Sequence, residues 1–328
     1  MKKILILGGT SFIGRNLVEK LIEMDAYELC LFNRQESAAR LFPSLSKIKG
    51  DRETEYIKQI EGIDWDYVID LSCYYPNALR RTLSTLKNVD RYIFISTCSV
   101  YNNEHKEVCL KNEESEILNC SLEEEKDRSP ASYGNRKAEC ERILQNSGFA
   151  YTILRPALVF GKYDPTDRLY YWLYQARSHK QLVLPENGER LFSTTYVMDL
   201  VESILRALKA KDASSIYNVV TNPKSSIKEI LAIAAADTLE EISLINASAE
   251  FLKQEGIKEW MDMPLWIHGD HFTYRNEKLK QELDIPFTDF RKAIIETIQY
   301  YHEINWPEPQ FGIPEKKKLA LISKQSTF

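Results

Sequence analysis

Several features that would assign this 328-residue chain to a simple class are missing. No apolar run approaches the roughly 20 residues that cross a bilayer, which argues against a membrane protein. The short apolar run after "MKK" is followed by glycines and has no cleavage-like site, so it indicates a buried strand and not a signal peptide. The six cysteines are scattered without a Cys-x-x-Cys pair, which predicts reduced thiols in a cytoplasmic protein and no disulfide framework.

The sequence also lacks an excess of basic residues. Its 43 Lys and Arg are outnumbered by 48 Asp and Glu, for a net charge of −5. Phosphate backbones and anionic membranes are bound by a surplus of positive charge, so nucleic acid and membrane surfaces are disfavoured as partners. We find no internal repeat and no low-complexity tract, and a small molecule is the expected partner.

Short apolar strands alternate with amphipathic helical runs in the first half of the chain. The expected strands are Lys3–Leu7, Glu28–Phe32, Lys47–Lys49, Tyr67–Leu71, Tyr92–Ser96 and Thr152–Leu154. Nearly continuous apolar strands are typical of parallel sheets buried on both faces. The pattern predicts an α/β fold, a Rossmann-type doubly wound parallel sheet.

Strands and helices alternate less regularly in the second half of the chain. The sequence there predicts a smaller C-terminal α/β lobe. We expect residues 1–160 to form the sheet domain and residues 161–328 to form mainly a substrate-binding lobe, with residues of about 190–220 returning to the sheet. An acidic stretch, residues 101–130, interrupts the first half; it is either a solvated insertion or a flap near the cleft. The basic run Lys316–Lys318 is expected to be a solvated face.

The loop "GGTSFIG" follows the first strand and opens a helix. Gly8 and Gly14 hold the first and third positions of a dinucleotide-binding glycine pattern, and Ser11 holds the middle one. The unpaired N–H groups and the dipole of a helix N-terminus favour a pyrophosphate. The Ser11 hydroxyl is able to donate to a phosphate oxygen in place of bare backbone.

The second strand ends in "LCLFNR", without the acid that usually binds the ribose 2′-hydroxyl. Asn33 stands there instead, and Arg34 follows it. A guanidinium pairs with a 2′-phosphate in bidentate fashion, so the sequence favours NADP over NAD. After the next strand, Asp51 and Arg52 are expected near the adenine.

Tyr133 and Lys137 in "SYGNRKAECERIL" are four residues apart and share one helix face. An ammonium within about 5 Å of a phenol is expected to lower the phenol's pKa toward neutrality, which makes Tyr133 a usable acid or base. The strand end "FISTCSVY" supplies hydroxyls to hold a substrate oxygen.

Together these motifs resemble the extended, atypical branch of the short-chain dehydrogenase/reductase superfamily, the NAD(P)-dependent epimerase/dehydratase family. The matching pieces are "GGTSFIG", "GDR", "FISTCSVY", "YGNRK", "LRPALVFG" and "YVMDLVESIL", in family order, followed by the segment from residue 276 to 301. The resemblance implies a homodimer with Tyr133 as acid/base, Lys137 on the nicotinamide ribose and Thr97 as the catalytic hydroxyl, with Ser96 and Ser99 as close rivals.

The resemblance and the glycine loop together give a set of expected cofactor contacts. These are Gly8, Thr10, Ser11, Phe12, Ile13, Gly14, Asn33, Arg34, Asp51, Arg52, Leu71, Ser72, Ser96, Lys137 and Pro156. No metal is expected, because the spacing of His268 and His271 matches no recognised metal pair.

Two departures from the family pattern concern the substrate. Leu158 stands where sugar-nucleotide enzymes often place an Asn on the diphosphate, and the expected diphosphate Arg is out of register, at Arg190. Arg168 is either an alternative anion contact or part of a structural ion pair. With Ser99, these residues are the candidate substrate contacts.

The sequence therefore predicts an NAD(P)-dependent oxidoreductase or epimerase acting on a hydroxyl or ketone of a small substrate, which includes sugars and nucleotide sugars. A dehydratase is less favoured, since Cys98 and Ser99 stand where that enzyme usually has an Asp-Glu pair. The alternative is a non-catalytic cofactor-binding regulator or an RNA-associated relative.

Overall fold

The computed structural model of the protein describes residues 1–35, 40–102, 110–178, 181–210, 214–238, 242–268 and 271–325. Its main sheet has seven parallel strands in the order β10-β6-β5-β4-β1-β2-β3. They are β1 Lys2–Leu7, β2 Tyr27–Asn33, β3 Ser46–Lys49, β4 Tyr67–Asp70, β5 Arg91–Ile95, β6 Tyr151–Pro156 and β10 Ser214–Val219. The predicted Rossmann-type doubly wound sheet is confirmed, and each expected strand lies within two residues of an observed one.

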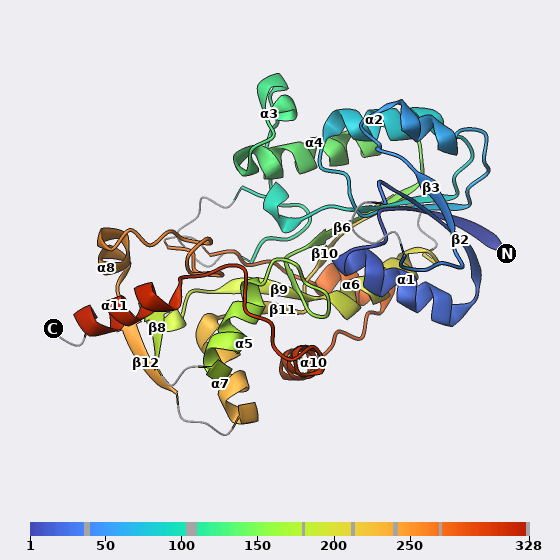
Figure 1. Ribbon diagram of the computed structural model, residues 1–328. Coiled ribbons are helices and arrows are strands. Elements are labelled where there is room, and N and C mark those ends of the chain that lie inside the picture. Colours follow the sequence, from blue (N-terminus) through green and yellow to red (C-terminus); the bar gives the residue numbers. More distant parts are fainter. Residues whose placement is uncertain are drawn as a thin grey trace.

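Helices cover both faces of this sheet (Figure 1). On one face lie α2 (Pro76–Thr85) and α4 (Tyr133–Gln145); on the other lie α1 (Phe12–Met24) and α6 (Val197–Ala207). The inner strands are mostly apolar, and the five residues of β5, Arg91 included, are all buried. Burial on both faces explains why these strands show a continuous apolar run and no alternation.

Two small sheets and the remaining helices lie beyond β6. The sheets are β11-β9-β7 and β12-β8, built from β7 Leu158–Phe160, β8 Gln181–Pro185, β9 Phe192–Tyr196, β11 Asn222–Ser225 and β12 Ser243–Ala247. The helices are α5 Arg168–Ser178, α7 Ile227–Thr238, α8 Ala249–Gln254, α9 Glu277–Leu283, α10 Phe290–Glu303 and α11 Glu315–Gln325. Helix α9 packs Leu279 and Leu283 into the core of the main sheet, whereas the other helices surround a separate apolar core that includes Trp172, Ile230 and Ile294.

The C-terminal helix corrects one expectation. Lys318 does not belong to a solvated face: it is buried, and its Nζ donates to Gln175 Oε1 at 3.0 Å and pairs with Glu315 at 2.7 Å. Leu321 and Ile322 on the same helix are also buried. An amphipathic helix that packs its apolar face on a core carries neighbouring lysine stems with it.

In the part of the chain that the structure describes, no helix is both long and apolar enough to cross a membrane. The acidic stretch contains a short helix, α3 (Leu122–Lys126), which begins with a capping box formed by Ser121 and Glu124. Residues 103–109 of that stretch are outside the described residues.

Candidate active site

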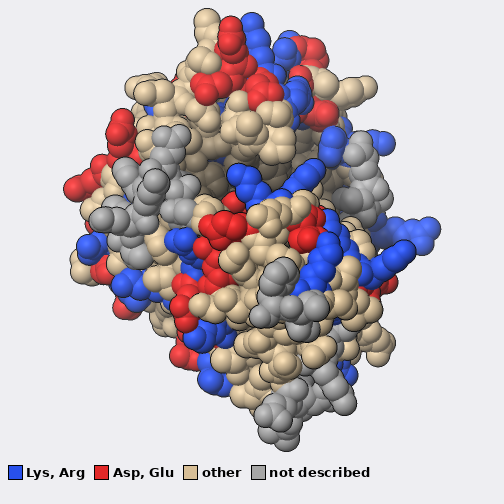
Figure 2. Space-filling model, turned by 90° about the vertical axis from the view of Figure 1, so that its left-hand side faces the viewer, with Lys and Arg blue, Asp and Glu red and all other residues tan. Residues whose placement is uncertain are grey.

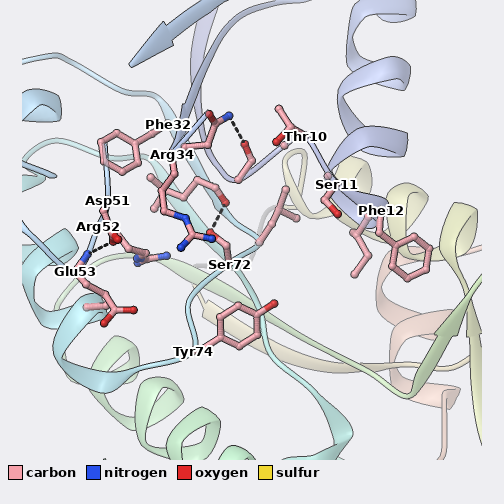
Figure 3. Close-up of a pocket in the computed structure, with 18 of the residues that line it drawn as sticks. Thr10, Ser11, Phe12, Phe32, Arg34, Asp51, Arg52, Glu53, Ser72 and Tyr74 are labelled. Carbon is pink, nitrogen blue, oxygen red and sulfur yellow. Dashed lines mark hydrogen bonds between the residues drawn. The ribbon is translucent and has the colours of Figure 1, made fainter. Parts of the chain in front are cut away.

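A cavity of about 630 Å³ lies where the chain leaves β1, β2, β3 and β4 at their carboxyl ends (Figure 3). Ligands of open α/β sheets bind at this edge. Most of the expected cofactor contacts line the cavity: Gly8, Thr10, Ser11, Phe12, Ile13, Gly14, Asn33, Arg34, Asp51, Arg52, Leu71 and Ser72.

The glycine loop is built to bring backbone close to a ligand. Gly8 has a φ of +113°, which side chains disfavour. A Cβ on Gly14 would lie 2.7 Å from both Cα and N of Gly9, so only glycine lets α1 approach the loop. Ser11 caps α1 without a side-chain cap hydrogen bond, and the first helical bond runs from Arg15 N to Ser11 O. The loop therefore offers the first N–H groups of α1 to an anion, as a pyrophosphate requires.

Asn33 and Arg34 take different roles at the end of β2. The Asn33 amide donates to Gly8 O at 3.3 Å, and its oxygen accepts from Gln35 N at 3.0 Å, so it braces the glycine loop. The Arg34 side chain extends into the cavity (Figure 3). At the end of β2, where an acid would bind the ribose, the described residues place Asn33.

Arg52 lines the cavity, but its guanidinium is committed to the protein interior. It pairs with Asp70 at 2.5 Å and donates to Thr82 Oγ1 at 2.9 Å, and Tyr92 donates to the same carboxylate at 2.6 Å. Burial alone would raise the pKa of Asp70, but the charge and hydrogen bonds of Arg52 hold it below its ordinary value. The pair is a structural support beneath the cavity.

Thr97 and Tyr133 meet beside the end of β5. Thr97 caps the short helix Cys98–Val100, where its hydroxyl accepts from Ser99 N at 3.1 Å and donates to Ser99 Oγ at 3.2 Å. Tyr133 begins α4, and the Thr97 hydroxyl is close enough to lower the pKa of its phenol. A Cβ on Gly134 would overlap the Ser99 carbonyl oxygen, so this glycine lets α4 start close to the segment that carries Thr97.

The expected lowering of the Tyr133 pKa is wrong for this structure. Burial raises the pKa of the phenol above its ordinary value, and the Thr97 hydrogen bond and the Arg168 charge only partly oppose it. The reason lies in Lys137, whose Nζ donates to the carbonyls of Cys73 at 2.9 Å and Ile95 at 2.7 Å. Its charge is directed to main-chain oxygens, and the phenol stays protonated at neutral pH.

Three of the expected cofactor contacts, Ser96, Lys137 and Pro156, do not line the cavity. The Ser96 hydroxyl donates to Glu141 Oε1 at 2.5 Å, and Glu141 forms a buried ion pair with Arg155 at 2.5 Å. This network fixes α4 against the ends of β5 and β6, because Glu141 lies on the Tyr133 helix. Pro156 is the buried last residue of β6.

The candidate substrate residues differ in the contacts that their side chains already make within the protein. Leu158 is buried in the apolar core beyond β6, and Arg190 pairs with Glu186 at 3.2 Å. Arg168 is partly exposed at the start of α5 and faces the Trp260 ring at 5.8 Å. Among the described residues it forms no ion pair, and its charge lowers the pKa of Tyr133, so it lies near the phenol.

Sequence reasoning missed several side chains that line the cavity, among them Glu53, Tyr74, Tyr75 and Arg128. Tyr74 is half exposed and points its hydroxyl into the cavity (Figure 3), with its ring 6.2 Å from that of Tyr133. The "YYP" that follows β4 was the one signal available for the tyrosines, since two large aromatics there depart from the family's small residues.

The face toward which the strand ends point is hollowed, and Lys and Arg side chains stand along the hollow (Figure 2). Asp and Glu side chains lie next to them, but three arginines, Arg34, Arg52 and Arg128, line the cavity itself. In the described residues, no three His, Cys, Asp or Glu side chains gather as a metal site would need. The local charge thus suits an anionic small molecule.

Comparisons with known proteins agree with this fold. The chain is 28% identical to the chloroplast stem-loop binding protein of 41 kDa b of Arabidopsis thaliana over 236 residues, 66% of this chain but only 58% of that protein. The crystal structure of dTDP-glucose 4,6-dehydratase from Bacillus anthracis in complex with NAD has a TM-score of 0.71 at 18% identity, over 92% of this chain and 97% of that one. UDP-glucuronic acid 4-epimerase from Bacillus cereus, in complex with UDP-glucuronic acid and NAD, has a TM-score of 0.70 at 17% identity, over 92% and 99%.

The match that decides the family is one of sequence. Residues 4–220 match the family described as the NAD dependent epimerase/dehydratase family, well over half of the chain. The matched span runs from β1 through β10 and so includes the glycine loop, Thr97, Tyr133 and Lys137. The chain belongs to the NAD dependent epimerase/dehydratase family, a family of enzymes of the extended short-chain dehydrogenase/reductase type.

Proposed function

We propose that the protein is an NADP-dependent oxidoreductase or epimerase acting on a carbinol or ketone of a small anionic substrate. The observation that carries the proposal is the placement of Thr97 and Tyr133 together at the end of β5, with Lys137 one helical turn away, beside a cavity formed by the glycine loop. Hydroxyl, phenol and ammonium at this edge suit proton transfer at a carbon–oxygen bond.

The residues present fit a dinucleotide. Gly8 and Gly14 leave space that a Cβ would fill, and the start of α1 offers unpaired N–H groups to phosphates. A bound nicotinamide would supply the hydride acceptor or donor. Two of the three N–H groups of Lys137 donate to carbonyls, so one is left for a ribose hydroxyl.

Tyr133 transfers the proton, and Thr97 positions the substrate oxygen. The Thr97 hydroxyl orients the substrate oxygen beside Tyr133, and the protonated phenol donates to that oxygen as a ketone becomes an alcohol. In the reverse direction Tyr133 accepts the proton. Because burial keeps the phenol neutral, the free protein is set up as a proton donor.

Titration with NADPH and NADH, followed by nicotinamide fluorescence, tests the cofactor assignment. We expect the wild type to prefer NADPH, because Arg34 extends into the cavity and β2 ends in Asn33 instead of an acid. Arg34→Ala should reduce NADPH affinity about 10- to 100-fold and leave NADH affinity nearly unchanged, as expected for one charge-assisted contact of about 1.5–3 kcal/mol. A wild type that prefers NADH would refute the assignment.

The substrate class follows from which arginine is available. Leu158 is apolar and Arg190 is held by Glu186, whereas Arg168 has no carboxylate partner among the described residues and lies near Tyr133. We expect turnover of UDP-glucuronic acid in preference to UDP-glucose, and Arg168→Gln should raise KM for the acid about 10-fold or more with a smaller effect on kcat.

Arg177→Gln provides the control for this experiment. Arg177 lies at the other end of α5 and faces Trp306 at 5.0 Å, so its loss should leave both sugars unaffected. An equal loss for both sugars in Arg168→Gln would mean that Arg168 binds the diphosphate and not an acid near the reacting carbon.

The second candidate function is RNA association, favoured by the 28% identity to a plant protein named for stem-loop binding. It predicts that labelled RNA stem-loops are retained at low salt. Retention that is unaffected by the loss of Tyr133 would support it; no retention, together with NADPH binding, would leave the oxidoreductase proposal standing.

A further inference from the structure

A second cationic side chain reaches the end of the cavity formed by Asn33, Arg34, Asp51 and Glu53, which we call the adenosine end. Arg128, six residues after the start of α3, lines the cavity and donates to both carboxylate oxygens of Glu53, at 2.5 and 3.4 Å. Its guanidinium also lies 4.1 Å from the centre of the Tyr75 ring. The acidic stretch, which precedes α4 in the chain, thus contacts the loop after β3.

The backbone on both sides of Arg128 is held firmly. Arg80 on α2 forms two hydrogen bonds to Glu125, at 2.8 and 3.0 Å. Arg136 donates to the carbonyl of Ser129 at 3.1 Å and to that of Asp127. The Asp127 carboxylate accepts from the Ser129 N–H and hydroxyl. This construction presents the Arg128 side chain at a fixed place over the cavity.

The Arg128 side chain itself is 66% exposed, and that of Glu53 is 33% exposed. An exposed ion pair of this kind is worth about 0–1 kcal/mol, so little opposes its exchange for another anion. A phosphate dianion offers a guanidinium two parallel charge-assisted hydrogen bonds and more charge than a carboxylate. Tyr75 meanwhile keeps the guanidinium plane oriented.

We propose that Arg128 binds an adenosine 2′-phosphate opposite Arg34. In the free protein the Glu53 carboxylate pairs with Arg128, and the phosphate displaces this carboxylate when it binds. The inference rests on the dinucleotide pocket of the proposed function and adds to it a residue from the acidic stretch. Glu53 lowers the affinity of the site for the phosphate, because it competes for Arg128 and repels a second negative charge.

Isothermal titration with adenosine 2′,5′-bisphosphate and adenosine 5′-monophosphate separates this site from the rest of the pocket. We expect the wild type to bind the bisphosphate at least 10-fold more tightly. Arg128→Ala should remove about 10-fold of that preference with the 5′-monophosphate unchanged, and Arg128→Lys should restore part of it. Glu53→Gln should tighten the bisphosphate several-fold.

Arg80→Ala and Glu55→Gln are the matched controls. Arg80 holds the same segment but does not line the cavity, and Glu55 pairs with Arg81 outside it. Equal effects of Arg80→Ala and Arg128→Ala would overturn a direct contact. Weaker binding of the 5′-monophosphate in Glu53→Gln would show that Glu53 holds the ribose and would overturn the displacement.

The proposed function and this inference fail in different ways. Equal binding of the two nucleotides by the wild type would overturn the 2′-phosphate site and leave a dinucleotide pocket intact. Binding of neither nucleotide would overturn both.

Discussion

Replacing Tyr133 with phenylalanine is expected to lower kcat about 10²- to 10⁴-fold, with NADPH affinity and the melting temperature close to those of the wild type. The magnitude is that of a lost general acid or base. The ring remains to fill its place against Tyr74, and only the hydroxyl near Thr97 is lost. The assay is turnover of a substrate found by screening UDP- and dTDP-sugars and simple ketones with wild-type enzyme.

The pH profile adds a readout that a merely structural role would not move. Burial raises the Tyr133 pKa above its ordinary value, so the proton-donating form persists through neutral and mildly alkaline pH. Ketone reduction should therefore be level from about pH 6 to 9, whereas alcohol oxidation, which needs the ionised phenol, should rise over the same range. A reduction rate that falls between pH 6 and 8 would contradict this and indicate a pKa near neutrality.

Tyr27→Phe is a suitable control for the loss of a phenol. Tyr27 begins β2, at the amino end of the sheet and on the side opposite the cavity. We expect its removal to change neither kcat nor the pH profile. A Tyr133→Phe enzyme with wild-type kcat would end the acid/base assignment and favour the non-catalytic candidate.

Gly14→Ala should reduce NADPH affinity at least about 100-fold, which corresponds to about 2.7 kcal/mol. The new methyl group would lie 2.7 Å from two backbone atoms of Gly9, and no side-chain rotation relieves such an overlap. Helix α1 must move away from the loop, and its unpaired N–H groups move with it. Overpacking of this kind also costs about 1–3 kcal/mol of stability.

Fluorescence titration and thermal melting measure the two effects separately. Gly62→Ala is the matched control, because its Cβ would meet nothing within 4 Å while its φ of +76° carries a backbone cost of its own. It should lower the melting temperature slightly and leave NADPH affinity unchanged. If the NADPH affinity of Gly14→Ala is within about threefold of that of the wild type, the glycine loop does not bind the cofactor.

The sequence predicted the sheet because burial on both faces leaves a direct trace, a continuous apolar run such as "YIFIS". The glycine loop was predictable for a similar reason. Gly8 is required by a positive φ and Gly14 by the close approach of the helix. Because residues close in the sequence determine such local geometry, the sequence alone reveals it.

Properties set by distant partners were not predictable. The pKa of Tyr133 depends on burial and on the carbonyls that take the charge of Lys137, which come from two other loops. Arg52 was placed near the adenine, but Asp70, 18 residues away, draws it inward. Arg128 and Glu53 are 75 residues apart, and no spacing rule brings them together.

The groups proposed to transfer the proton come from the end of β5 and from helix α4, whereas Arg168, the proposed substrate contact, comes from α5, beyond β6. Arg168 nevertheless links the two, because its charge lowers the pKa of Tyr133. A designer who wants a different specificity with the same proton donor should therefore keep Arg168 and diversify the other positions of α5.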